Sequence, residues 1–169
     1  MSTFLFIVVF IIVASAAIGA VSAAPWLPTR RGDVSRIMEL AQVGPGDVVY
    51  DLGCGDGRLV FAAARRGARA IGVEVFVLPY LWAKVKSFFI PGSKIVFGDL
   101  FRQDISDASV VCIFLLDKSY PRLIEKFRKE LKSGSRVVTA AWPLREISAD
   151  IIDKPSSKYL SLFLYKFNT

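Results

Sequence analysis

The sequence predicts an α/β fold with a doubly wound, mostly parallel sheet, and three observations support this prediction. Between residues 47 and 141, short apolar runs typical of buried strands alternate with amphipathic segments typical of helices. A glycine-rich turn at residues 53–57 joins the first strand to a helix, which begins a strand–helix–strand unit. Each of the first three strands also has an acidic residue at its end. Alternation of this kind is typical of parallel sheets with helices on both faces.

Residues 4–24 precede this domain and contain no charged side chain. A helix of that length spans about 31 Å, which matches the hydrocarbon core of a bilayer. A cleavable signal peptide is the alternative, but residues 1–3 lack the basic region of such a peptide. We therefore expect residues 1–27 to form a single-pass transmembrane helix with an interfacial linker. Because Arg30 and Arg31 follow the span and no basic residue precedes it, the positive-inside rule places the following domain on the cytoplasmic side of the membrane.

The remaining residues, 28–169, are expected to form one domain. Asp33 is placed to cap a first helix at residues 33–42. A Gly-Pro-Gly turn leads into the first strand, and the helix after the glycine turn ends at Gly67. Along the rest of the domain we expect strands at 69–73, 94–98, 108–116 and 136–141, helices at 76–89 and 122–132, and a final antiparallel hairpin from 147–152 and 159–167. The last strand is therefore expected to be antiparallel.

The helix expected at residues 76–89 is very apolar and carries two lysines. Packing against the sheet is the simpler interpretation, which we favour. The alternative is that its aromatic side chains rest on a membrane or on a membrane-bound substrate. These side chains are Tyr80, Trp82, Phe88 and Phe89.

The glycine turn carries the main functional signal. It reads Asp51-Leu52-Gly53-Cys54-Gly55-Asp56-Gly57, a G-x-G-x-G pattern that differs from the G-x-G-x-x-G of dinucleotide-binding proteins. Its glycines permit positive φ angles and close approach of a ligand, and the following helix offers unpaired N–H groups. Asp51 closes the strand and favours a positively charged ligand group. A cofactor with both an ammonium and a carboxylate fits this combination better than a pyrophosphate does, and a tight turn without a ligand is the alternative.

Two further acids follow the second and third strands. Glu74 can accept hydrogen bonds from both hydroxyls of a ribose. Asp99 can accept one from an adenine amino group, with Leu100 covering a face of the ring. Open α/β sheets bind ligands outside the carboxyl ends of their strands. We therefore expect Asp51, Glu74 and Asp99 to face one crevice, although each alone is also explained as a solvated carboxylate at a strand end.

The composition narrows the chemistry of the chain. Its 169 residues carry a net charge of +7 and include no histidine, which removes the commonest general base and the commonest metal ligand. Cys54 and Cys112 match no zinc spacing, so we expect no metal site. We expect two free thiols in a reducing compartment, and a disulfide is the alternative. The positive charge favours anionic partners. We nevertheless interpret the basic residues of 122–132 as a solvated helix face and expect no nucleic-acid partner.

The glycine turn and the two later acids together resemble the class I S-adenosylmethionine (SAM) methyltransferases over most of residues 33–141. This resemblance implies a Rossmann-like fold and SAM as the cofactor. The implied cofactor-binding residues are Asp51, Gly53, Cys54, Gly55, Asp56 and Gly57 along the methionine portion, Glu74 at the ribose, and Asp99 and Leu100 at the adenine.

A narrower resemblance is carried by Pro28-Thr29 and by residues 46–58, 111–116 and 130–138. These segments are similar to the FAM173-type proteins, which are membrane-anchored protein-lysine methyltransferases known from mitochondria, with prokaryotic relatives. The chain departs from that group in two places. The group usually has serine at the position of Cys54, and proline where Arg30 follows Pro28-Thr29.

We therefore expect a SAM-dependent enzyme that methylates a lysine of a protein, with a membrane-associated or membrane-embedded acceptor. Asp117 and Tyr120, after the fourth strand, are the candidates for holding the amine, and capping of the next helix is the alternative role of Asp117. Methylation of a small molecule or a nucleic acid and a non-catalytic SAM-binding membrane module are the alternative functions. The glycine spacing disfavours a nicotinamide-dependent oxidoreductase. The absence of an Asn/Asp-Pro-Pro-Tyr/Phe sequence disfavours methylation of base amino groups.

Overall fold

The computed structural model describes residues 3, 5–7, 9–10, 13–14 and 28–168. Most of the span expected at residues 4–24, and all of the linker that follows it up to residue 27, lie outside the described residues. Within the part of the chain that is described, no helix is both long enough and apolar enough to cross a bilayer.

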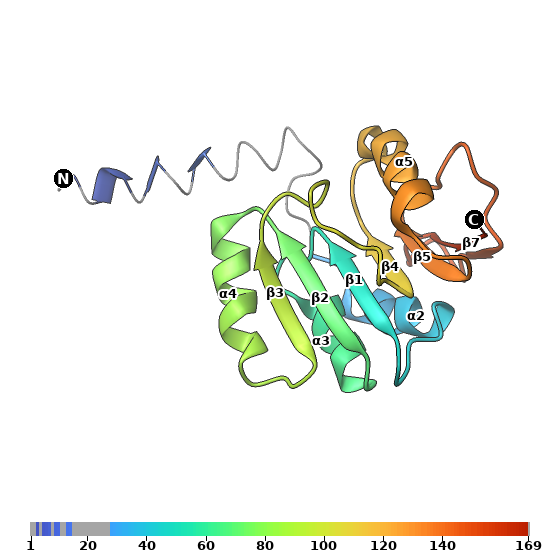
Figure 1. Cartoon of the computed structure of the whole chain (residues 1–169), viewed down its shortest axis with the longest axis horizontal. Coiled ribbons are helices and arrows are strands. Elements are labelled where there is room, and N and C mark those ends of the chain that lie inside the picture. The colour runs from blue at the N-terminus through green and yellow to red at the C-terminus, as the bar shows by residue number, and fades with distance from the viewer. Residues whose placement is uncertain (1–2, 4, 8, 11–12, 15–27, 169) are drawn as a thin grey trace.

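The domain is built on a seven-stranded sheet with the order β3-β2-β1-β4-β5-β7-β6 (Figure 1). The first five strands pair in parallel, as the alternating pattern predicts. β7 is antiparallel to β5 and to β6, which confirms the expected antiparallel hairpin at the end of the chain. The strands are β1 (Val48–Leu52), β2 (Arg69–Glu74), β3 (Ser93–Phe97), β4 (Val110–Ile113), β5 (Ser135–Ala140), β6 (Ile151–Asp153) and β7 (Leu162–Phe167).

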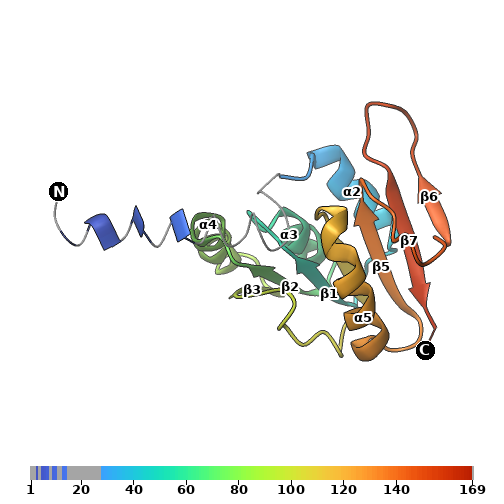
Figure 2. The same ribbon diagram turned by 90° about the horizontal axis from the view of Figure 1, so that it is seen from above.

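Helices cover the two faces of the sheet unequally (Figure 2). One face carries α2 (Arg31–Leu40), α3 (Arg58–Arg65) and α4 (Val77–Ser87), whose buried side chains form one apolar cluster with the sheet. The other face carries the short helix η1 (Asp117–Ser119) and α5 (Tyr120–Glu130), which belongs to a second apolar cluster. Residues 98–109 and 141–150 connect strands on this second face without a helix, so loops cover the sheet there.

Several elements differ from their expected bounds. In the last hairpin, the segments expected at 147–152 and 159–167 form strands only at Ile151–Asp153 and Leu162–Phe167. The fourth strand is shorter than expected because the chain leaves the sheet after Ile113 to enter η1. The first helix begins two residues earlier than expected, at Arg31, with Arg30 as its N-cap. Asp33 therefore lies within the first turn and does not cap the helix: its side chain is buried and bonds Arg36 instead.

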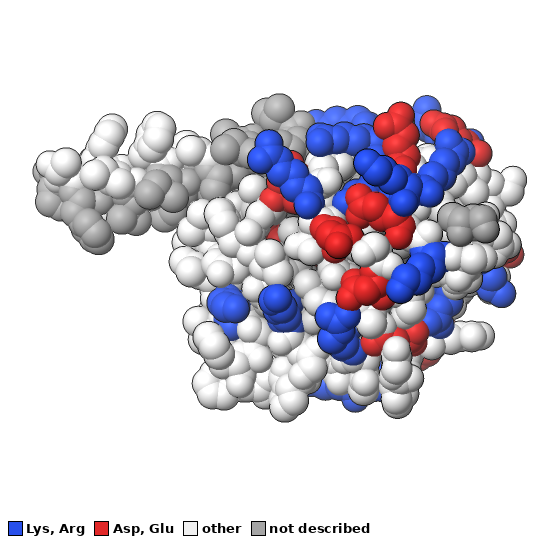
Figure 3. Space-filling view, viewed as in Figure 1, with Lys and Arg blue, Asp and Glu red and all other residues white. Residues whose placement is uncertain are grey.

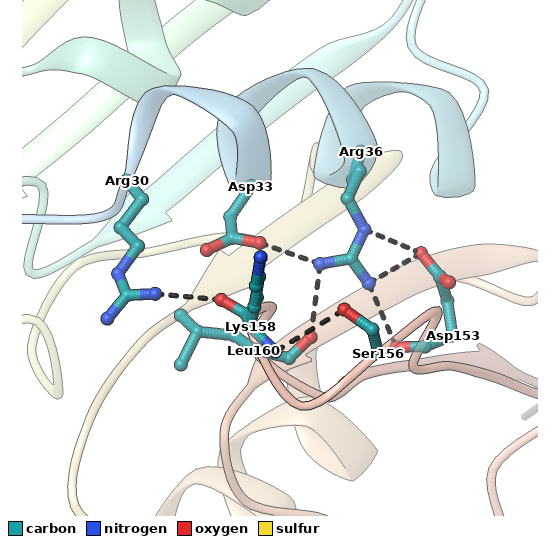
Figure 4. Close-up of polar contacts among 7 residues, drawn as sticks. All are labelled: Arg30, Asp33, Arg36, Asp153, Ser156, Lys158 and Leu160. Carbon is teal, nitrogen blue, oxygen red and sulfur yellow. Dashed lines mark hydrogen bonds and ion pairs between the residues drawn. The ribbon is translucent and has the colours of Figure 1, made fainter.

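Arg36 fastens α2 to the segment between β6 and β7 (Figure 4). Its guanidinium lies 2.6 Å from the Asp33 carboxylate and 2.8 Å from the Asp153 carboxylate. It also donates to the main-chain oxygens of Asp153 and Leu160. We call this set of contacts the α2 latch. It joins the helix that precedes the glycine turn to the last hairpin of the sheet.

Candidate functional site

The three predicted acids emerge at the same edge of the sheet. Asp51 in β1 pairs with Gly72 of β2, and Glu74 at the end of β2 pairs with Phe97 at the end of β3. Asp99 follows β3 by two residues. The glycine turn lies at this edge too, because its Gly53 and Cys54 N–H groups both donate to the carbonyl of Val73 in β2, at 2.9 and 3.0 Å. The parallel register therefore brings the expected residues to one crevice.

The glycine turn adopts the conformation that its composition predicts. Gly53, Gly55 and Gly57 have φ angles of +89°, +54° and +79°. At Gly57, a Cβ atom would lie 2.7 Å from the ring of Phe61, so a side chain is excluded there by space as well as by φ. The result is bare backbone at the N-terminus of α3, where the helix dipole favours negative charge.

Glu74 is buried and holds the glycine turn to the sheet. One carboxylate oxygen accepts the Gly55 N–H at 2.7 Å, and the other accepts the N–H groups of Val75 and Phe76 at 2.9 and 2.8 Å. Burial raises the pKa of Glu74, while these three backbone donors act in the opposite direction. A carboxylate oxygen has two lone pairs, so Oε2, with its single donor, keeps capacity to accept a hydroxyl donor from a ligand.

Asp51 is only 4% exposed, and no hydrogen-bond donor or ion-pair partner meets its carboxylate within the described part of the chain. Burial raises the pKa of Asp51 to about 8, and the negative charges of Glu74 and Asp56 add to the effect. A buried carboxylate is costly unless a partner neutralises it. The geometry therefore leaves a place for a cationic group beside the glycine turn.

The other two side chains of the turn are engaged with the protein. Asp56 forms an ion pair of 2.6 Å with Arg58, whose hydrogen bonds lower the pKa of this carboxyl. Arg58 also donates to the main-chain oxygen of Thr29, so the pair connects the turn to the segment before α2. Cys54 is buried, and burial raises the pKa of its thiol well above the ordinary value. Its side chain packs on β2 and remains protonated at neutral pH.

Asp99 and Leu100 lie beside the crevice with different exposure. The Asp99 carboxylate is partly exposed and accepts the N–H of Phe101 at 2.9 Å. Arg102 approaches its other oxygen at 3.9 Å. Leu100 is buried in the apolar cluster on the α5 side of the sheet. Asp99 is thus accessible to a ligand, whereas Leu100 supports the loop from below.

The two residues predicted to hold the acceptor amine have different environments. Asp117 lies at the start of η1 and pairs with Arg145 at 2.5 Å. Tyr120 is buried, and its hydroxyl has no hydrogen-bond partner among the residues that the structure describes. Both residues line a pocket of about 320 Å³, together with Lys118, Pro121, Ile124, Pro143, Arg145 and Glu146. Asp117 is therefore accessible at the rim of this pocket, and Tyr120 forms part of its wall.

Sequence reasoning missed four residues that contribute to the site. The backbone N–H groups of Val75 and Phe76 orient Glu74, and no side-chain pattern signals such donors. Leu115 packs against the glycine turn, since a Cβ on Gly53 would lie 3.1 Å from its Cδ2 atom. Arg58 had a usable signal, because an arginine two residues after Asp56, across a glycine, is well placed to pair with it.

These features fit an amino-acid-bearing nucleoside. The unpartnered Asp51 carboxylate suits an ammonium group, and the N-terminus of α3 suits a carboxylate. Glu74 and Asp99 stand at the next two strand ends, where a ribose and a base would follow. The fit rests on the donors and acceptors that the chain presents at this edge of the sheet.

Comparison with known proteins agrees with this geometry. The family model described as the ANTKMT methyltransferase domain matches residues 51–151. A protein-lysine N-methyltransferase of Saccharolobus islandicus (strain REY15A) is 40% identical over 126 residues, which cover 72% of this chain and 78% of that protein. An adenine nucleotide translocase lysine N-methyltransferase of Mus musculus is 32% identical over 124 residues, which cover 71% of this chain and 54% of the mouse protein. The match thus spans about half the length of the mouse relative.

A solved structure shares both the fold and part of the sequence. It is an RNA methyltransferase from Salinibacter ruber in complex with S-adenosyl-L-homocysteine, with a TM-score of 0.77 and 31% identity. The match covers 83% of this chain and 93% of that protein. The bound product of SAM in this similar protein agrees with the ligand chemistry that the crevice presents.

Proposed function

We propose that the acceptor is a lysine of a membrane-associated protein. The premise is that the chain belongs to the family of ANTKMT methyltransferase domains and is a SAM-dependent protein-lysine methyltransferase. Support for the acceptor class comes from the lysine methyltransferases among its relatives. Support for the membrane comes from the uncharged run at residues 4–24.

One observation carries the assignment of the cofactor site. The Asp51 carboxylate is buried and unpartnered in the described chain, next to a turn whose three glycines all have positive φ angles. We assign the ammonium of the cofactor to Asp51 and its carboxylate to the N-terminus of α3. The N–H groups of Gly53, Cys54, Gly55 and Gly57 already donate within the chain, so these residues shape the turn along which the methionine portion lies. Asp56 supports this backbone through its pair with Arg58.

Glu74 and Asp99 hold the nucleoside in this assignment. Glu74 is fixed by three backbone donors, so its carboxylate is oriented before the ribose arrives. Asp99 accepts from the adenine amino group, and Leu100 supports the loop beneath the ring. A preformed acceptor loses less conformational entropy when its ligand binds.

The chain contributes to the reaction mainly by alignment. Bound SAM supplies a methyl group on a positively charged sulfur, which a neutral amine can take without further activation. Correct alignment of reacting groups is worth up to roughly 7–11 kcal/mol in favourable systems. Because the chain has no histidine, a carboxylate or water must take the proton of the lysine ammonium. We assign Asp117, at the rim of the pocket, to holding the ammonium, and Tyr120 to shaping the pocket wall.

The proposal includes a location for the enzyme. Residues 4–24 act as a single-pass transmembrane helix, and residues 28–169 form the catalytic domain on the cytoplasmic side. Arg30 and Arg31 directly after the span support this orientation. Resistance to alkaline carbonate extraction, together with protease access to the domain only from the cytoplasmic side, is the expected result. Release by carbonate or protection from cytoplasmic protease contradicts this location.

The function is tested by incubating the full chain with radiolabelled SAM and a membrane fraction. We expect label in a membrane protein, and amino-acid analysis should find it as methyl-lysine.

Glu74→Ala should weaken SAM binding by about 1.5–3 kcal/mol, which is the worth of hydrogen bonds to a charged group. Glu125→Gln changes an exposed carboxylate on α5 and serves as the control. If Glu74→Ala binds SAM as tightly as the parent protein, the assignment of Glu74 to the ribose is wrong. In the labelling experiment, SAM binding without transfer of label would favour a non-catalytic module.

A second acceptor class has support from one observation. The similar Salinibacter ruber structure is described as an RNA methyltransferase, and this chain carries a net charge of +7. The same labelling experiment with total RNA decides between the classes. Label that is removed by ribonuclease and resists protease would replace the protein acceptor with RNA.

A further inference from the structure

The outer face of α4 is apolar and open to solvent. Six side chains on α4 and the turn after it are 50% to 81% exposed, at spacings of three and four residues that place them on one side of the helix. We call this set the α4 stripe. It consists of Leu78, Leu81, Trp82, Val85, Phe88 and Phe89.

Packing on the sheet explains only the opposite face of this helix. Ala83 is fully buried against the sheet. The ring of Tyr80 lies 5.1 Å from that of Phe97 in β3. Because these contacts already fix α4, the stripe has no role in the fold of the described chain. The favoured expectation that this helix packs on the sheet therefore holds for one face alone.

The charged side chains in the segment that carries the stripe all have one sign. Residues 75–98 include Lys84, Lys86 and Lys94 and no acidic residue. Lys84 lies over the ring of Phe88 at 5.6 Å and Lys86 over that of Trp82 at 4.6 Å, so two of these cations border the stripe itself. None of the three lysines forms an ion pair among the residues that the structure describes. Figure 3 shows basic but not acidic side chains over the lower part of α4 and β3.

We propose that the α4 stripe binds the interface of a lipid bilayer that contains anionic lipids. An apolar helix face with tryptophan and phenylalanine, bordered by lysines, is the pattern of interfacial membrane helices. The lysines complement the negative charge of lipid head groups, and Trp82 lies where the interface favours aromatic side chains. The absence of acids from residues 75–98 matches a bilayer surface, whose negative charge meets the whole length of the helix.

This contact orients the crevice relative to the membrane. Glu74 lies just before α4, so the first turn of this helix adjoins the cofactor site, while Phe88 and Phe89 lie toward the other end of the strands, where β3 begins. The inference goes beyond the proposed acceptor and does not depend on it. A domain held by the α4 stripe places the β2–β3 end of the crevice nearest to the head groups, whether or not the acceptor is a membrane protein.

The test uses the full chain with a single tryptophan as the reporter. The double variant Trp26→Phe/Trp142→Phe keeps Trp82 on the stripe. The matched control, Trp26→Phe/Trp82→Phe, keeps Trp142, which is 46% exposed just after β5. Four strand spacings of about 4.8 Å, or about 19 Å, separate β5 from β3, on which α4 packs.

Each reporter is mixed with vesicles of phosphatidylcholine and phosphatidylglycerol whose acyl chains carry bromine near the head group. We expect Trp82 emission to shift to shorter wavelength and to lose intensity with the brominated lipid, while Trp142 emission stays unchanged. Lys84→Gln/Lys86→Gln in the Trp82 reporter should reduce this quenching in phosphatidylglycerol vesicles. In vesicles of phosphatidylcholine alone the two lysine changes should have little effect.

Three outcomes overturn the proposal. The first is unquenched Trp82 in protein that floats with the vesicles. The second is protection of Trp82 from acrylamide without lipid at every protein concentration, because a segment of the same chain then covers the stripe. The third is protection that grows with protein concentration, because a second copy then covers it. None of these measurements uses methyl transfer, so failure of the proposed function and failure of the lipid contact are separate results.

Discussion

At the scale of single residues, the buried carboxylate of Asp51 links the cofactor site to the stability of the fold. Its pKa is raised from 3.8 to about 8 because it is buried beside Glu74 and Asp56, and none of the residues that the structure describes pairs a cation with it. The folded chain therefore holds a proton that the unfolded chain releases at a much lower pH. This group's contribution to stability is complete below about pH 4 and is lost as the pH rises through about 8.

Asp51→Asn should therefore stabilise the cofactor-free protein above pH 8 and weaken its binding of SAM. Urea unfolding at a series of pH values measures the first effect, since the variant loses the pH dependence that Asp51 causes between about pH 4 and 8. Titration calorimetry with SAM measures the second. Glu125→Gln should change neither quantity. Equal SAM affinity in Asp51→Asn and the parent rejects Asp51 as the ammonium partner.

Gly72 shows a requirement for space on β2. A Cβ atom there would lie 2.6 Å from Cys54 Sγ and 2.7 Å from Val60 Cγ2, both buried. Gly72→Ala should therefore cost about 1–3 kcal/mol of unfolding free energy, the usual cost of overpacking a core. Gly44→Ala is the control, because a Cβ at Gly44 meets nothing within 4 Å. Adding Cys54→Ala should restore part of the loss, and no recovery there would show that the thiol is not the obstacle.

At the scale of elements, the α2 latch determines how the start of the domain meets its last hairpin. Asp33 is fully buried, and among the described residues only one of its carboxylate oxygens has a hydrogen-bond partner, which is Arg36. Arg36 also bonds Asp153 and lies 5.2 Å from the ring of Tyr159. One guanidinium thus compensates two carboxylates on segments that are distant in sequence.

Arg36→Ala should destabilise the domain by about 3–5 kcal/mol, because it leaves the Asp33 charge buried without its partner. Arg31→Ala removes an exposed arginine from the same helix and should have little effect. Denaturant unfolding measures the loss. Hydrogen exchange should also speed up in β6 and β7 of the variant. A cost below about 1 kcal/mol, the level of an exposed pair, would contradict the buried-charge argument.

At the scale of the whole molecule, the crevice couples cofactor binding to folding. It draws on β1, β2, β3 and the start of α3, so unfolding of the domain destroys it. A ligand at one hundred times its dissociation constant stabilises a protein by about 2.7 kcal/mol. For a chain of 169 residues this corresponds to a rise of about 5–11 °C in Tm.

We therefore expect S-adenosylhomocysteine at saturation to raise the Tm by this amount in differential scanning fluorimetry. NAD at the same concentration should leave the Tm unchanged, because the glycine turn and Asp51 do not suit a pyrophosphate. Asp51→Asn should lose most of the shift. An equal rise in Tm with NAD would favour a nicotinamide-dependent enzyme over a SAM-dependent one.

The sequence by itself determined the strand, the glycine turn, the helix and the three acids at strand ends. These features depend on neighbouring residues: glycine is needed where φ is positive, and an acid at the end of a parallel strand reaches the shared edge in any register. Their assembly into one crevice therefore followed from the alternating pattern.

Only the tertiary structure decided how the buried charges and exposed apolar groups are distributed. Arg36 meets Asp153 across 117 residues of sequence, and this contact draws Asp33 into the latch. Asp51 is buried beside the carboxylates of Glu74 and Asp56, and no ion-pair partner reaches it from the described parts of the chain. α4 is apolar on two sides, and the single sheet beside it covers one of them. A local sequence pattern shows whether a side chain is charged or apolar, but the residues that it contacts come from distant segments. The exposed α4 stripe and the unpaired carboxylate of Asp51 could therefore be identified only in the folded chain.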